Sequence, residues 1–222
     1  MTPVILYGME FSVYVRICRM ALSEKGIDYT LEPVDVFEDP LPDGYLALHP
    51  FRKMPAFRHG DVVLYEARAI TQYVDEAFDG PSLQPDDPLH RARQAQIISI
   101  ADNNLYRSLV WGYFVETVSR PGEGKATDEA VMAKAAETAE TALPAIENLF
   151  RGKPYTNGER IGLADLHLAP IFDYFLRCEA APGLMKDRQR LCEWWTAIKQ
   201  RDSYLKTPYG PPDDASLPAL KL

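Results

Sequence analysis

The sequence has few cysteines, and none of them is placed to form a disulfide or metal motif. Its 222 residues include three cysteines, Cys18, Cys178 and Cys192, which lie far apart in the chain. No C-x-x-C spacing or neighbouring histidine cluster accompanies them, which argues against disulfide staples and a zinc site. We therefore expect reduced structural cysteines and no bound metal.

The chain also lacks an excess of positive charge and a long apolar segment. It carries 24 Lys and Arg residues against 32 Asp and Glu residues, a net charge of -8 at pH 7. This charge would on average repel a polyphosphate, so nucleic acid is not an expected partner. No apolar run approaches the length of a membrane span, and the first residues, MTPVILY, lack the basic start of a secretion signal. We expect a cytoplasmic protein without a membrane partner.

The pattern of the sequence changes near residue 80. Before this point, short apolar runs at residues 4–7, 27–36 and 56–64 are separated by stretches with helical spacing. Their order predicts a β-α-β unit, a loop segment and then a β-β-α unit. His59-Gly60-Asp61 has the composition of the hairpin turn.

Turn-forming residues are dense between residues 79 and 88, which predicts a linker. After it, apolar residues recur with helical spacing over residues 89–118, a span longer than most globular helices. A second helix is expected to begin beside Asp128 and Glu129. We predict an α/β domain over residues 1–80, a linker over 81–87 and an all-helical domain over 88–222 that ends in a proline-rich tail.

Three separated motifs resemble the glutathione transferase family. HPFRKMPAF at residues 49–57, followed by EARAI at 66–70, is similar to the family's NPFGKVPAL and ESxAI. LYGMEFSVYVR at residues 6–16 resembles the serine-type branch, most nearly the phi class and bacterial phi-like or theta-like members. PYTNGERIGLADL at residues 154–166 resembles the family's pattern for a buried helix start. The resemblance covers residues 4–205.

This resemblance implies a fold, a co-substrate and an assembly. It implies a thioredoxin-like N-terminal domain of βαβ-ββα order, an all-α C-terminal domain, glutathione as the co-substrate, no metal, and a homodimer. In the third motif Gly162 stands where the family has a capping hydroxyl, whereas Asp165 is retained. A glycine cap costs only a few tenths of a kcal/mol relative to serine, so Asp165 is read as a structural residue rather than a catalytic one.

The resemblance places Ser12 at the catalytic position. A free cysteine thiol has a pKa of about 8.5, so glutathione is mainly an unreactive thiol at pH 7. Lowering that pKa by about 2 units needs roughly 2.7 kcal/mol of preference for the thiolate, and one hydrogen bond to a charged group contributes about 1.5 to 3 kcal/mol. Ser12 opens the first helix and could supply this bond, helped by the helix dipole. Tyr7 is the alternative donor, since other branches use a tyrosine near the end of the first strand.

The resemblance also assigns a glutathione site. A cis turn before Pro55 would present the backbone N–H and C=O of Met54 to the peptide part of glutathione, whereas the Met54 side chain is expected to matter little. Glu66 would meet the γ-glutamyl ammonium, and the N–H groups of Glu66 and Ala67 would face the γ-glutamyl carboxylate. Ala67 replaces a family serine, which removes one hydrogen bond to that carboxylate.

One loop departs from the family pattern at Pro40 and Leu41. Phi-like members carry a His-Lys pair there for the glycine carboxylate of glutathione, and neither Pro40 nor Leu41 can replace that charge. Lys53 is then the main candidate for this carboxylate, with Arg52, in place of a family glycine, and His49, in place of a family asparagine, nearby. Each of these three residues could instead be a solvated surface charge.

We expect an enzyme that adds the glutathione thiolate to apolar electrophiles. Aromatic side chains at residues 106–114 could line the electrophile pocket, although such a run is more often part of a core. Two alternatives stay open. One is a non-catalytic ligand-binding or regulatory protein, which Pro40, Leu41 and Ala67 favour, and the other is a glutathione-dependent peroxidase or reductase.

Overall fold

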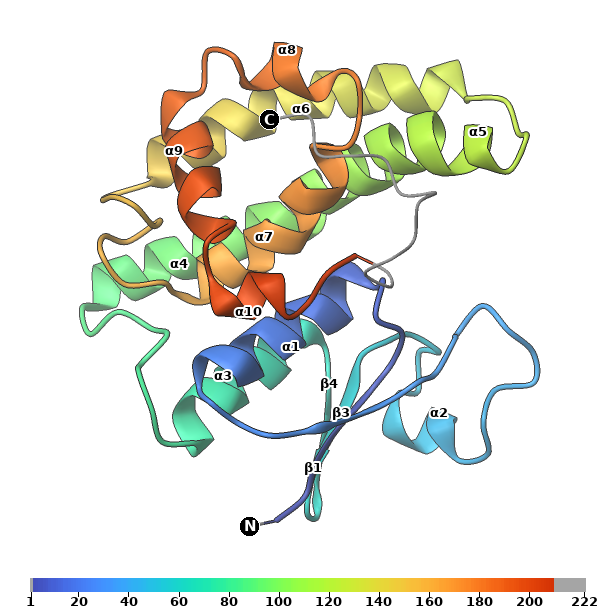
Figure 1. Ribbon diagram of the computed structural model, residues 1–222, viewed down its shortest axis with the longest axis vertical. Helices are drawn as coiled ribbons and strands as arrows, with labels where there is room; N and C mark the ends of the chain where they lie inside the picture. Colours follow the sequence, from blue (N-terminus) through green and yellow to red (C-terminus); the bar gives the residue numbers. More distant parts are fainter. Residues whose placement is uncertain (1, 210–222) are drawn as a thin grey trace. The chain divides into compact units, whose positions relative to one another are not determined.

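The computed structural model describes residues 2–209, which form two compact units (Figure 1). The first unit comprises residues 2–83 together with 201–209, and the second comprises residues 84–200. An α/β unit is therefore followed by a helical unit, which confirms the predicted fold class.

The first unit is built on a mixed four-stranded sheet of order β2-β1-β3-β4. Strand β1 (Val4–Tyr7) runs parallel to β2 (Thr30–Glu32) and antiparallel to β3 (Ala56–His59). Strand β4 (Val62–Tyr65) completes the predicted hairpin with β3. The second apolar run of the sequence contributes only three residues to the sheet.

Helices pack on one face of this sheet and a short helical turn packs on the other. Helices α1 (Val13–Glu24) and α3 (Ala67–Ala77) contact each other and cover the face that carries the buried Leu6. Because successive strand residues point to opposite faces, Tyr7 lies on the other face. There it packs with the cluster around Tyr45, the first residue of α2 (Tyr45–Leu48).

The boundary between the units falls three residues inside the predicted linker. Leu83 is buried, and its N–H donates to the Asp75 carboxylate at 2.7 Å. Lys25 pairs with the same carboxylate at 3.4 Å and donates to the Pro81 carbonyl at 3.3 Å. These contacts hold residues 81–83 on the first unit.

The end of the described chain also belongs to the first unit, so the assignment of all residues from 88 onward to the helical domain is wrong for residues 201–209. Helix α10 (Asp202–Leu205) contacts α1. The Glu24 carboxylate of α1, whose side chain is 8% exposed, accepts hydrogen bonds from Arg201 Nη2 and Ser203 Oγ, both at 2.5 Å. These polar contacts join residues far apart in the chain, which a local sequence pattern does not reveal. Most of the proline-rich tail lies outside the described residues.

The second unit is helical and begins with the long helix that the sequence predicts. That span consists of α4 (Pro88–Ile100) and η1 (Ala101–Ser119), in which hydrogen bonds follow the wider i to i-5 pattern of a π-helix. A side chain at Gly112 would meet Ala135 Cβ at 2.3 Å, so this glycine lets η1 and α6 approach closely. The further helices are α5 (Arg120–Gly122), α6 (Glu129–Leu149), α7 (Leu163–Phe175), α8 (Ala181–Met185) and α9 (Gln189–Ile198).

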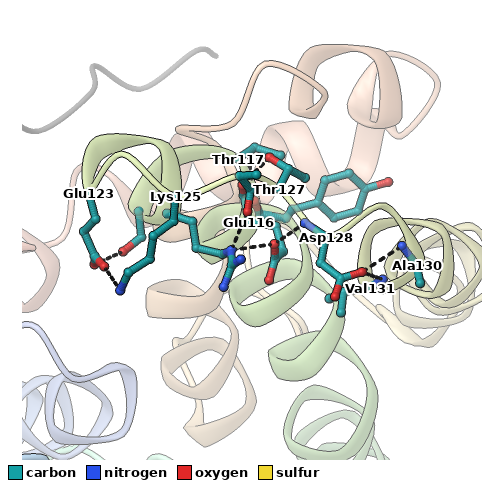
Figure 2. A network of polar contacts seen from close by, with 12 residues as sticks. Glu116, Thr117, Glu123, Lys125, Thr127, Asp128, Ala130 and Val131 are labelled. Carbon is teal, nitrogen blue, oxygen red and sulfur yellow. Dashed lines mark hydrogen bonds and ion pairs between the residues drawn. The ribbon is translucent and has the colours of Figure 1, made fainter.

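Polar contacts fix the turn between η1 and α6 (Figure 2). Glu116 is buried, and its carboxylate accepts the N–H of Asp128 at 2.8 Å and pairs with Arg120 at 3.1 Å. Thr127 Oγ1 donates to the Glu116 carbonyl at 2.8 Å. Asp128 in turn accepts two N–H groups of the first turn of α6, as the predicted cap requires.

A single buried carboxylate organises the start of α7. Asp165 accepts hydrogen bonds from the Thr156 N–H and hydroxyl, from the Gly162 N–H and from Trp194 Nε1, at 2.8 to 3.1 Å. Gly162 caps the helix without a side chain. Asp165 therefore joins the preceding loop, α7 and α9, which confirms its structural role. Among the described helices, none is long and apolar enough to cross a membrane.

The pH dependence of stability should report on Asp165. Burial raises the pKa of Asp165 to about 6, although its four hydrogen bonds act in the opposite direction. Since this exceeds the unfolded pKa of about 3.9, the group contributes stability that is full at low pH and is lost as the pH rises through about 6. The stability difference between wild type and Asp165→Asn should therefore be about 2 kcal/mol larger near pH 4.5 than near pH 7.5.

Urea unfolding followed by tryptophan fluorescence measures this difference. Glu137→Gln is the control, because the hydrogen bond from Lys134 lowers the pKa of the exposed Glu137 and gives its contribution the opposite sign. A difference for Asp165→Asn that shrinks toward low pH would contradict the assignment.

Candidate functional site

The loop between β1 and α1 is shaped by Gly8. Gly8 has a φ of 143°, in the region that favours glycine, and its N–H donates to the Glu32 carbonyl at 3.0 Å. A Cβ at this position would lie 2.5 Å from Val15 Cγ2 and 3.1 Å from Met54 Cβ. The absence of a side chain lets the start of α1 approach the turn that carries Met54.

Ser12 caps the N-terminus of α1. Its Oγ accepts the N–H of Val15 at 3.4 Å, and its carbonyl accepts the N–H of Arg16 at 2.9 Å. Within residues 2–209 no acceptor lies within hydrogen-bond distance of the Ser12 hydroxyl proton. The half-buried hydroxyl can therefore donate to a ligand, at a helix end whose dipole favours negative charge.

Tyr7 lies on a different surface of the first unit. Its side chain packs with the apolar cluster of Val34, Tyr45 and Ala56, on the sheet face away from α1 and α3. This environment is that of a packed aromatic strand residue.

The predicted cis turn is present at Met54-Pro55. Among the described residues, no hydrogen bond uses the N–H or C=O of Met54, so both groups are available to an extended peptide. The expectation that the Met54 side chain matters little is incomplete, because Met54 Sδ accepts the N–H of Met9 at 3.3 Å. This contact holds the loop before Ser12 against the turn.

Glu66 and Ala67 form the start of α3. Glu66 is the N-cap, with a φ of 70° that is uncommon for a residue with a side chain, and Ala67 is the buried first residue of the helix. The Glu66 side chain is exposed, and within residues 2–209 it forms no hydrogen bond or ion pair, although its charge acts on His49. Strained backbone of this kind is concentrated at ligand-binding positions.

Of the three candidate cations, only Lys53 presents a free charge. The Lys53 side chain is exposed, and its ammonium has no partner among residues 2–209, while its carbonyl accepts the Tyr45 hydroxyl at 2.7 Å. Burial lowers the pKa of His49, whose ring lies 5.0 Å from the ring of Tyr65, so His49 is neutral at pH 7. It is therefore not a solvated surface charge.

Arg52 has a role that the sequence did not suggest. Its guanidinium donates to the carbonyls of Val36 and Glu38 and pairs with Asp39 at 3.2 Å. Arg52 thus contacts the loop that contains Pro40, and it is neither an unattached surface charge nor a free cation. The sequence carried one signal for this, an arginine at a position where the resemblance expects glycine.

Among the remaining candidates, Cys18, Tyr113 and Phe114 belong to the interior of their units, whereas Trp111 is exposed. Burial raises the pKa of the Cys18 thiol, which excludes it as a thiolate nucleophile near neutral pH. Tyr113 and Phe114 are buried in the second unit, with edge-on ring contacts to Phe175 and Tyr174. Residues 2–209 contain no group of three His, Cys, Asp or Glu side chains placed to hold a metal ion.

Comparison with known proteins assigns a family to both units. The model of the glutathione S-transferase N-terminal domain matches residues 6–82, and that of the C-terminal domain matches residues 113–202. Glutathione S-transferase 3 of Zea mays is 31% identical over 224 residues, which cover 97% of this chain and 100% of the relative. The chain belongs to the glutathione S-transferase family. Glutathione S-transferase F14 of Arabidopsis thaliana is 34% identical over 84% of this chain and 75% of its own length.

A solved member of the glutathione S-transferase family agrees with the fold. The structure of glutathione S-transferase-I bound with the ligand lactoylglutathione has a TM-score of 0.79 and 25% identity, over 92% of this chain and 98% of that chain. All of the predicted site residues, Ser12, Lys53, Met54, Pro55, Glu66 and Ala67, lie within the matched N-terminal domain.

Substitution of Gly8, a buried residue of the loop between β1 and α1, should damage the site. Gly8→Ala places a Cβ against Val15 and Met54, so we expect the free energy of unfolding to fall by about 2 kcal/mol or more and glutathione-dependent turnover to fall with it. Gly26→Ala is the matched control, because Gly26 also has a positive φ, 68°, but no atom within 4 Å of a built Cβ. It should cost about 1 kcal/mol and leave turnover intact. Equal effects of the two variants in urea unfolding would contradict the role given to Gly8.

Proposed function

We propose that the protein conjugates the thiolate of glutathione to apolar electrophiles, and that Ser12 is the hydrogen-bond donor to this thiolate. The observation that carries the proposal is the unengaged hydroxyl proton of Ser12 at the N-terminus of α1. Family membership supports the transferase activity, and the solved relative with lactoylglutathione supports a site for a glutathione derivative.

The chemistry requires ionisation of a thiol near neutral pH. Ser12 accepts from its own helix through Oγ and can donate its proton outward at the same time. A hydrogen bond to the thiolate of about 1.5 to 3 kcal/mol nearly accounts for the roughly 2.7 kcal/mol that a shift of about 2 pKa units requires. The positive end of the α1 dipole adds to this preference. Tyr7 is the weaker candidate, because its ring packs in an apolar cluster.

The remaining residues of the proposed site bind the peptide of glutathione. Met54, fixed by the cis bond to Pro55, offers its N–H and C=O as an added strand would require. Glu66 presents its exposed carboxylate to the γ-glutamyl ammonium, and the N–H groups of Glu66 and Ala67, at the start of α3, donate to the γ-glutamyl carboxylate. Lys53 supplies the cation for the glycine carboxylate.

The protein is also proposed to be a homodimer. Its first unit exposes Phe51 to 64%, beside Tyr65 on the edge strand β4. Exposed aromatic residues of this kind are common where protein surfaces associate.

Ser12→Ala should separate thiolate activation from glutathione binding. Since the hydroxyl acts mainly on the charged sulfur, we expect turnover with chlorodinitrobenzene to fall by about tenfold to a hundredfold and the apparent pKa of bound glutathione to rise. The affinity for glutathione should stay nearly unchanged. The pH dependence of kcat measures the pKa, and calorimetric titration measures the affinity.

Tyr7→Phe is the matched variant, because it also removes one hydroxyl and preserves the ring. It should retain the wild-type rate. Full activity of Ser12→Ala together with an inactive Tyr7→Phe would show that Tyr7, not Ser12, donates the hydrogen bond to the thiolate. A wild type that binds glutathione without conjugation would favour the non-catalytic alternative, and turnover confined to hydroperoxides would favour the peroxidase.

Lys53→Met tests recognition of the glycine carboxylate. We expect it to weaken glutathione binding by about 1.5 to 3 kcal/mol, the range for a hydrogen bond to a charged group, with little change of rate at saturation. Binding of γ-glutamylcysteine, which lacks the glycine, should not change. Arg58→Met removes an exposed cation from β3 and is the control for a general charge effect. Equal affinity of the wild type for both ligands would refute the assignment.

A further inference from the structure

The segment between β2 and α2 has little regular structure to hold it. Residues 33–44 contain neither a strand nor a helix, and Phe37 at its tip is 71% exposed. Within the segment, Asp35 accepts the N–H of Phe37 at 2.9 Å. Val36 and Leu41 pack partly on the cluster around Tyr45.

Apart from the backbone hydrogen bonds that Tyr45 and Ala47 of α2 donate to Pro42 and Gly44, the hydrogen bonds between this segment and the rest of the described chain come from one side chain. Arg52 Nε donates to the Val36 carbonyl at 3.3 Å, and Arg52 Nη2 donates to the Glu38 carbonyl at 2.9 Å and to Asp39 Oδ1 at 3.2 Å. The planar guanidinium reaches Val36 from Nε and both Glu38 and Asp39 from Nη2, a geometry that a lysine ammonium cannot reproduce.

Arg52 adopts this position in spite of an unfavourable backbone. Its φ is 50°, in the left-handed region that favours glycine. The residue next to it, Lys53, is held by α2, because the Tyr45 hydroxyl donates to the Lys53 carbonyl at 2.7 Å. The backbone that carries the Lys53 ammonium is therefore fixed both by Arg52 and by α2.

We propose that Arg52 is a positioning residue for the glycine end of glutathione. It does not touch the substrate. Instead it ties residues 36–39 to the turn before Met54, and so fixes the positions of this loop and of the Lys53 backbone before glutathione binds. The inference rests on the proposed function, in which Lys53 meets the glycine carboxylate. It differs from a direct charge role, because the Arg52 guanidinium is already engaged by Asp39 and two carbonyls.

Arg52→Gly tests the inference. It removes the guanidinium and also the backbone strain, so the melting temperature should not fall. We expect the KM for glutathione to rise about fivefold with kcat within twofold of wild type, while the KM for γ-glutamylcysteine stays unchanged. Hydrogen exchange of the amides of residues 36–39 should become at least tenfold faster.

Arg52→Lys distinguishes positioning from charge. The lysine keeps the charge but cannot donate from two separate nitrogens as the guanidinium does. The KM of Arg52→Lys for glutathione should therefore resemble that of Arg52→Gly. Rescue by lysine, or unchanged KM and exchange in Arg52→Gly, would overturn the inference even though the wild type conjugates glutathione. A wild type without any glutathione turnover would instead refute the proposed function, and this inference with it.

Discussion

The close approach of Gly8 to Val15 and Met54 is the constraint on which the first unit depends. It brings together three parts of the chain: the end of β1, the first turn of α1 and the turn before β3. The hydrogen bond from the Met9 N–H to Met54 Sδ also holds the loop after β1 against the turn before β3. Ser12 is positioned by this close approach together with its backbone hydrogen bonds to Met9 and Arg16, since its side chain forms one hydrogen bond, of 3.4 Å. Close packing at a glycine can therefore help to place a side chain several residues away.

The second unit relies on buried carboxylates at two of its turns. Asp165 and Glu116 are buried carboxylates, and each gathers N–H or O–H donors from segments that have no regular structure of their own. A buried charge that is satisfied in this way defines one loop conformation, because an alternative conformation would leave the charge without partners.

Features with a local signature could be predicted from the sequence, and features that join distant residues could not. The hairpin turn beside Gly60, the cap at Asp128 and the cis bond before Pro55 each depend on a few consecutive residues. The contacts of Arg52 span 13 to 16 residues, and that of Met54 with Met9 spans 45. Nothing in the spacing of a sequence identifies such partners, because loop geometry rather than helical or strand periodicity brings them together. The roles of Ser12 and Lys53 stay predictions for another reason, because they depend on a bound ligand.

The return of residues 201–209 to the first unit has a consequence for how the protein is made. Arg16 of α1 is fully buried and donates to the carbonyl of Thr207, 191 residues later. During synthesis on the ribosome, α1 and the sheet emerge long before the segment that covers them, and the whole second unit is translated in between. The side of α1 that residues 201–209 cover stays uncovered until those residues have been translated, a period of roughly ten to forty seconds at typical elongation rates. A nascent chain of this protein thus completes its helical unit before its glutathione-binding unit, although the latter is encoded first.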